Sequence, residues 1–179
     1  MPGSLFAPPV RLCDKHKELL HSFHCGERAL DLWLRTDALP NEARGASRTY
    51  VVLSTGTGQL AGFFCLSMHD VERTELGAQI KPGMPKPVPA ILLGRLAVAL
   101  QYQCHGLGES MLQEAVFMAK CIAATLGAAA LITHPISEKA ASFYKKHGFS
   151  AVQSDKTMMF IGLHDPILDN AIQIDNGTR

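Results

Sequence analysis

Two stretches of the chain hold residue types whose spacing could support chemistry, and the first reads Gln-Cys-His-Gly-Leu-Gly at residues 103–108. It lies between an apolar run and a long helical pattern, where glycines let a phosphate approach the N–H groups at the positive end of a helix. It is not a Walker loop, since no Gly-Lys-Ser/Thr follows, and it lacks the first glycine of a dinucleotide fingerprint. The stretch predicts a phosphate-binding loop; the alternative is a tight turn whose glycines only permit close packing.

The second stretch is Phe-Tyr-Lys-Lys-His-Gly-Phe at residues 143–149, at the end of a helical pattern. The phenol of Tyr144 can donate a proton to a leaving thiolate. A tyrosine near the end of a helix more often serves packing. From this stretch alone both interpretations stay open.

Two other groups of residues suggest chemistry that their spacing does not support. His21, His24 and Cys25 could begin a zinc site, but no second pair of ligands follows at a suitable distance. Cys104 and His105 are adjacent, and adjacent residues seldom orient as a nucleophile and its base. We therefore expect surface histidines, no metal site and no covalent intermediate.

Charged residues gather in two regions. Residues 76–98 carry Lys81, Lys86 and Arg95 without any acid. Further lysines lie near Tyr144, and together these residues predict a modest basic rim that could contact RNA. The further lysines are Lys139, Lys145 and Lys146. Between residues 27 and 48 both signs interleave, which predicts a solvated surface. The interleaved residues are Arg28, Arg35, Arg44 and Arg48 with Glu27, Asp31, Asp37 and Glu42.

Hydrophobic periodicity predicts the elements that must position these residues. A buried strand at 90–98 precedes the glycine stretch, and a helix at 106–126, with a core face running from Leu107 to Leu126, follows it. Tyr144 lies on a helix at 138–146 with Ser137 as its N-cap. The other predicted elements are an edge strand at 10–12, helices at 14–23 and 26–38, a chain return at 41–47, a hairpin of 49–54 and 59–68, a proline-rich loop at 81–89, and strands at 129–134, 149–153 and 157–163.

Composition bounds the class of protein. The 179 residues, 47% of them hydrophobic, fit one domain over residues 1–163 with a tail at 164–179. The 17 basic and 16 acidic residues nearly cancel, which gives no support for a strongly basic nucleic-acid binder. We expect a soluble cytoplasmic protein, since neither a leader nor a membrane span is evident, and no disulfides among the five scattered cysteines.

Together with the strand Leu-Gly-Arg-Leu-Ala-Val at 93–98, the two stretches resemble the GNAT acetyltransferases. The resemblance implies an α/β (α+β) fold with a mixed, mostly antiparallel sheet flanked by helices, whose central strands splay to admit the pantetheine arm of acetyl-CoA. It implies that Gln103, Gly106 and Gly108 bind the pyrophosphate. The strand residues Leu96, Ala97 and Val98 would hydrogen-bond the pantetheine and the acetyl group.

A narrower resemblance covers roughly residues 10–163. The motifs are Phe-His-Cys-Gly at 23–26, Leu-Asp-Leu-Trp-Leu at 30–34, Asn41, Gly-Ala-Ser-Arg-Thr-Tyr-Val at 45–51 and Pro-Val-Pro at 87–89. They are similar to those of the GNAT toxins of bacterial toxin–antitoxin pairs, which acetylate the α-amine of aminoacyl-tRNA. This resemblance implies a homodimer and a small ribbon-helix-helix antitoxin as partner. The alternatives are an N-acetyltransferase for a small amine or a protein N-terminus, and a catalytically silent CoA-binding or antitoxin-binding module.

The resemblance also assigns residue roles. Tyr144 would be the general acid for the departing CoA thiolate. Further cofactor contacts would lie at Cys104, His105, Glu109, Ser137 and Phe143. The chain departs from the family at Ala99, where an acidic residue is frequent, at Cys104 and His105, where glycine and a basic residue are common, and at Ser137, where many members have asparagine.

Overall fold

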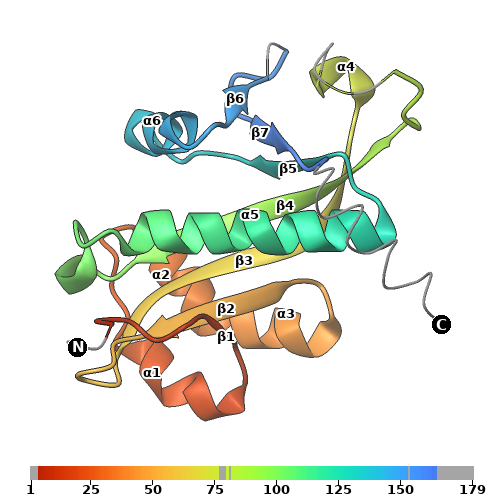
Figure 1. Cartoon of the computed structure of the whole chain (residues 1–179). Coiled ribbons are helices and arrows are strands. Elements are labelled where there is room, and N and C mark those ends of the chain that lie inside the picture. Colours follow the sequence, from red (N-terminus) through yellow and green to blue (C-terminus); the bar gives the residue numbers. More distant parts are fainter. Residues whose placement is uncertain (1–3, 77–79, 81, 153, 165–179) are drawn as a thin grey trace. The chain divides into compact units, whose positions relative to one another are not determined.

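The computed structural model describes residues 4–76, 80, 82–152 and 154–164 (Figure 1). It contains two compact units, one of residues up to Ser67 with Gly94–Ala115, and one of Met68–Leu93 with residues from Val116 onward. Each unit is described by itself below. The single domain over residues 1–163 stays a prediction, and residues 165–179 of the predicted tail lie outside the described residues. Within the described part of the chain, no helix has the length and apolar character needed to cross a membrane.

The strands of the first unit confirm the predicted edge strand and hairpin. β1 (Val10–Arg11) pairs antiparallel with β2 (Arg48–Leu53), which pairs antiparallel with β3 (Leu60–Val71). β3 and β4 (Val88–Val98) each have residues in both units. In the sheet, the hydrogen-bonded strands follow the order β1-β2-β3-β4-β5-β7-β6. This is the mixed, mostly antiparallel sheet that the resemblance implied.

The helices before β2 differ from the prediction in their bounds and in number. The predicted helix at 14–23 is a 3-10 turn, η1 (Asp14–His16), followed by α1 (Lys17–His21). The predicted helix at 26–38 is α2 (Arg28–Thr36). A further helix, α3 (Ala38–Arg44), occupies the first part of the predicted return at 41–47, so only residues 45–47 return the chain to β2. Pro40 falls in the first turn of α3, where its missing N–H has no intrahelical partner to lose. Gly45, with φ of 73°, then ends the helix in the left-handed region.

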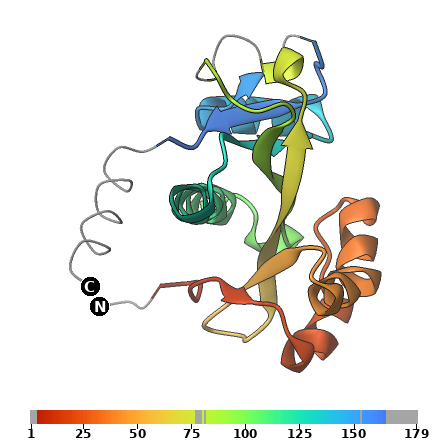
Figure 2. The same ribbon diagram turned by 90° about the vertical axis from the view of Figure 1, so that its right-hand side faces the viewer.

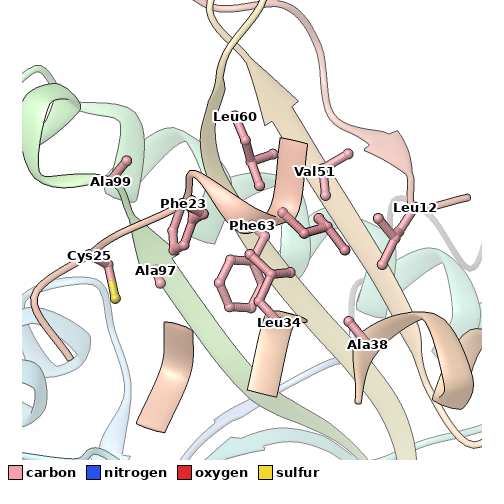
Figure 3. Close-up of a cluster of buried hydrophobic side chains, with 11 residues drawn as sticks. Leu12, Phe23, Cys25, Leu34, Ala38, Val51, Leu60, Phe63, Ala97 and Ala99 are labelled. Carbon is pink, nitrogen blue, oxygen red and sulfur yellow. The ribbon is translucent and has the colours of Figure 1, made fainter. Parts of the chain in front are cut away.

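Helices α1 to α3 cover one face of the strands of the first unit (Figure 2). Their apolar residues meet Phe63 of β3 and Ala97 of β4 in one core cluster, in which the rings of Phe23 and Phe63 are 5.3 Å apart and edge to face (Figure 3). Gly62 faces the other way, because a Cβ there would lie 2.8 Å from Met111 of α5 (Leu107–Leu126). Successive residues of β3 thus alternate between the face covered by α2 and the face covered by the first turns of α5.

The second unit holds β5 (Ala130–Thr133), α6 (Glu138–Lys146), β6 (Ser150–Ala151), β7 (Met159–Gly162) and the short α4 (Arg73–Leu76). β4 pairs parallel with β5 over Ala90 to Leu92. β7 pairs antiparallel with β6, as predicted for the segment at 157–163, and it also pairs antiparallel with β5. The predicted strand at 149–153 is shorter, and Gln153 lies outside the described residues.

Two predictions in this unit were wrong. Val88 and Pro89 were assigned to the proline-rich loop but begin β4, since the first positions of a strand tolerate proline. Pro89 contributes its carbonyl, which accepts a hydrogen bond from Ala129 N. Leu126 was assigned to the core face of α5 but is 75% exposed, because it is the last residue of the helix before Gly127.

Candidate active site

The end of β4 and the loop before α5 are joined by the side chain of Gln103. Its Nε2 donates to Val98 O and to Cys25 O, each at 3.0 Å. The 3-10 turn between them, Leu100–Tyr102, is held by Leu100 N, which donates to His24 O at 2.9 Å. The amide of Gln103 is therefore engaged with two carbonyl oxygens of the protein and fixes the loop in place.

The backbone of this loop presents a helix N-terminus. Ser110 N donates to Gly106 O at 3.1 Å, so Gly106 lies at the start of the first turn of α5, at the end of a helix where N–H groups point outward. Gly106 has φ of 78°, and a Cβ there would meet no atom within 4 Å. Glycine is thus required for its backbone conformation, and the space beside it is open, as a phosphate cradle needs.

The remaining loop residues are placed as follows. Cys104 is exposed and takes a φ of 64°, which is uncommon for a residue other than glycine. His105 is exposed and its Nδ1 lies 2.7 Å from Gln103 O. Gly108 is half-buried and Glu109 is exposed. All four, with Gln103 and the strand residues Leu96, Ala97 and Val98, belong to the first unit.

Asp31 of α2 fixes the segment to which Gln103 is bonded. Asp31 is 4% exposed, and its carboxylate accepts a hydrogen bond from Cys25 N at 2.9 Å and lies 2.6 Å from Nδ1 of His24. Burial alone would raise the pKa of Asp31, but the hydrogen bonds from Cys25 and His24 outweigh it and hold that pKa below its usual value. Burial and the neighbouring Asp31 raise the pKa of the Cys25 thiol to about 12.

The prediction that the charges between residues 27 and 48 form only a solvated surface was therefore wrong for Asp31. It was also wrong for Glu42, whose carboxylate accepts a hydrogen bond from Thr49 N at 2.6 Å and pairs with Arg11 at 2.9 Å. A second arginine, Arg48, lies 3.4 Å from the same carboxylate. Both acids tie a helix to a neighbouring segment.

Tyr144 belongs to the second unit and is 7% exposed, with its ring packed at 5.4 Å from Phe143 and 5.3 Å from Phe149. Burial raises the pKa of Tyr144, while the hydroxyl of Thr133 acts on the phenol in the opposite direction. Thr133 is itself buried and donates to Leu93 O at 3.0 Å. The phenol is thus held protonated beside a fixed hydroxyl, which suits a proton donor.

Ser137 confirms its predicted role as the N-cap of α6, since its Oγ accepts a hydrogen bond from Ala140 N at 3.1 Å. Phe143, one turn and a half along the helix, is half-buried. Together with Tyr144 these residues belong to the second unit, and the loop residues belong to the first. Among the described residues, no three His, Cys, Asp or Glu side chains are grouped so that they could hold a metal ion.

Comparison with known proteins decides the family. The model of the acetyltransferase (GNAT) domain matches residues 46–151. A tRNA-acetylating toxin of Mycobacterium tuberculosis is 32% identical over 160 residues, which cover 89% of this chain and 94% of the relative. The chain belongs to the GNAT acetyltransferase family.

Solved structures of GNAT toxins have the same fold. AtaT complexed with acetyl-methionyl-tRNAfMet aligns with a TM-score of 0.80 and 25% identity, covering 94% of this chain and 98% of that one. A Tyr-to-Phe mutant of AtaT bound to the C-terminus of the antitoxin AtaR aligns with a TM-score of 0.76 and 25% identity, covering 96% and 98%. The GNAT fold predicted from the strand, loop and helix at 90–126 is thereby confirmed, and the chain is an acetyltransferase.

Proposed function

We propose that this GNAT acetyltransferase moves the acetyl group of acetyl-CoA to the α-amine of an aminoacyl-tRNA and so blocks translation. The observation that carries this proposal is the 32% identity to a tRNA-acetylating toxin over nearly the full length of both chains. The likeness to AtaT, whose solved complex contains acetyl-methionyl-tRNAfMet, supports the same class of acceptor.

The first unit would bind the phosphates of acetyl-CoA at the N-terminus of α5. The open space beside Gly106 and the N–H groups of the first turn fit a pyrophosphate, which the positive end of the helix attracts. Gln103 would act through the backbone conformation that it fixes. The β4–β5 pairing ends at Leu92, before Leu96, so the strand residues Leu96 to Val98 are proposed as the hydrogen-bonding edge for the pantetheine.

The second unit would supply the acid. An α-amine has a pKa near 8, which an ester neighbour lowers, so a useful fraction is neutral at about pH 7 and needs no strong base. The amine nitrogen forms a bond to the acetyl carbonyl carbon, the carbon–sulfur bond breaks, and the departing thiolate takes the phenolic proton of Tyr144. The ammonium formed on the acceptor releases its proton to solvent, and the phenolate, beside Thr133, is reprotonated from solvent.

A small protein antitoxin is the proposed partner of the toxin. The support is the likeness to AtaT bound to the C-terminus of AtaR. A ribbon-helix-helix fold for that antitoxin, a homodimer of this chain and a cytoplasmic location stay predictions. Induced expression should arrest growth, and a co-expressed antitoxin should relieve the arrest.

The deciding experiment is transfer of radiolabelled acetyl from acetyl-CoA to a pool of charged tRNA, with uncharged tRNA and free amino acids as controls. Label on charged tRNA alone, released by mild base as an N-acetyl amino acid, supports the proposal. If no RNA is labelled while acetyl-CoA still binds, the acceptor is not aminoacyl-tRNA and a screen of small amines follows.

A further inference from the structure

Arg95 of β4 lies against the ring of Trp33 of α2, with its guanidinium carbon 4.3 Å from the ring centroid. Trp33 is stacked in turn on Phe63, with centroids 6.1 Å apart and planes 13° apart. The guanidinium therefore rests on a two-ring aromatic platform, which attracts a cation without using its N–H donors.

Arg95 differs from the other arginines of this unit whose hydrogen bonds are known. Arg35 donates to Phe23 O at 2.7 Å, and Arg11 and Arg48 both pair with the carboxylate of Glu42. Within the part of the chain that the structure describes, no carboxylate or carbonyl oxygen accepts a hydrogen bond from Arg95, although its side chain is half-buried. A guanidinium with a fork of available donors in a partly desolvated place favours a phosphate or carboxylate.

The position of Arg95 separates this place from the phosphate cradle of α5. Side chains alternate along β4, so Arg95 points to the same face as Ala97 and Ala99, which belong to the core cluster with α1 and α2. The first turns of α5 cover the opposite face, against Gly62. Arg95 immediately precedes Leu96, the first residue of the edge proposed for the pantetheine. An anion bound to Arg95 would thus lie next to this edge, on the face of β4 that α2 covers.

We infer that Arg95, held on Trp33, binds a phosphodiester at the 3′ end of the acceptor RNA and so directs the aminoacyl group to the acetyl donor. This inference rests on the proposed function. A phosphodiester is present next to the terminal nucleoside of every aminoacyl-tRNA, and an arginine fork recognises it through paired hydrogen bonds. Arg95 is therefore a specificity-determining residue for RNA-borne amines against small amines.

The test compares two acceptors that carry the same amino acid, namely an aminoacyl adenosine without phosphate and its cytidylyl-(3′→5′)-adenosine counterpart with one phosphodiester. With Arg95→Met, kcat/KM for the phosphodiester acceptor and for whole charged tRNA should fall roughly ten- to a hundredfold, since hydrogen bonds to a charged group are lost. The value for aminoacyl adenosine should change by less than about twofold. The slope of log kcat/KM against log salt should become shallower by about 0.7, as expected for one lost contact to a single strand.

Arg44→Met, which removes an exposed arginine at the end of α3, is the matched control and should leave all three acceptors unchanged. Arg95→Lys keeps the charge and the stem, so it tests the fork if the methionine variant is unstable, and it should recover only part of the loss. Trp33→Leu should reproduce the selective loss. Retained affinity for acetyl-CoA shows that each variant is folded.

Three results would overturn the inference. An equal loss with both small acceptors would mean that Arg95 has a structural role, and a rise only in the KM for acetyl-CoA would mean that it binds the donor. A loss confined to acidic amino acids would mean that it binds the amino-acid side chain. Failure of the wild-type protein to acetylate any charged tRNA would instead refute the proposed function, which keeps the two failures distinct.

Discussion

Replacing Gln103 by leucine tests whether this residue fixes the unliganded loop or contacts the pyrophosphate directly. The change keeps the size of the side chain but removes the two 3.0 Å hydrogen bonds to Val98 O and Cys25 O. At about 1 kcal/mol for each neutral hydrogen bond, the free energy of unfolding should fall by about 2 kcal/mol. For a chain of this length that corresponds to a decrease in Tm of about 4–8 °C.

Thermal unfolding without ligand measures this loss, and calorimetric titration then gives the affinity for acetyl-CoA. The affinity should fall by roughly three- to tenfold, because the loop must be ordered again on binding. Gln101→Leu is the matched control, since Gln101 is exposed and its Nε2 donates only at the surface, to Gln59 Oε1 at 3.3 Å. Its Tm should change by less than about 2 °C.

An unchanged Tm in Gln103→Leu, together with a large loss of acetyl-CoA affinity, would refute this reasoning. It would mean that the amide contacts the pyrophosphate directly and contributes nothing to the unliganded loop. Gln103→Glu provides a second discrimination, because a carboxylate facing two carbonyl oxygens should destabilise the protein more than leucine does. Equal stability of the glutamate variant and the wild-type protein would also contradict the role of Gln103 in fixing the loop.

Further expectations concern the acid, the buried carboxylate and the thiols. Tyr144→Phe should lower kcat about 10²- to 10⁴-fold with acetyl-CoA affinity unchanged in calorimetry, and an active phenylalanine variant would exclude Tyr144 as the acid. Thr133→Val should move the alkaline limb of the kcat profile to higher pH, because the hydroxyl that lowers the pKa of Tyr144 is removed; an unmoved limb would count against this. Asp31→Asn should cost about 2 kcal/mol of unfolding free energy near pH 7. Because the pKa of Asp31 is depressed in the folded state, its contribution to stability is present above the ordinary pKa near 4 and is lost as pH falls through the folded pKa. The urea midpoints of wild type and variant should therefore converge in acid and stay apart at neutral pH. A disulfide reagent at about pH 8 should modify the exposed Cys104 quickly and Cys25 only after unfolding, and similar rates for both thiols would contradict the burial that raises the pKa of Cys25.

Much of the fold could be predicted from local patterns. The hairpin of β2 and β3 follows from alternation around the glycine turn, and α5 and α6 follow from apolar periodicity with a recognisable cap or glycine stop. α3 was missed because Pro40 argues against a helix, although its cost vanishes in the first turn. The exposure of Leu126 depends on where the helix ends against its neighbours, which periodicity does not measure.

The candidate site was predictable only where its chemistry is local. Residues 103–108 and Tyr144 were proposed as site residues because the sequence places them where a strand, a glycine turn and a helix follow one another. The residues that hold them were not. In the sequence, Asp31 and Glu42 look like ordinary surface charges. Their buried hydrogen bonds join segments that only the folded chain brings together. Gln103 meets Cys25 across 78 positions of sequence, a distance over which no local pattern can act.

Helix α2 contacts both parts of the proposed site in the first unit, through residues that lie far apart in sequence. Asp31 fixes the segment that receives the amide of Gln103, so α2 supports the donor loop from one end. Two residues further along α2, Trp33 carries the guanidinium of Arg95. One helix thus positions both the loop proposed for the donor phosphates and the arginine proposed for the acceptor phosphate. A change at Asp31 should therefore disturb acetyl-CoA binding first, whereas a change at Trp33 should disturb RNA selection, and a double-mutant cycle between them would measure how far α2 couples the two substrates.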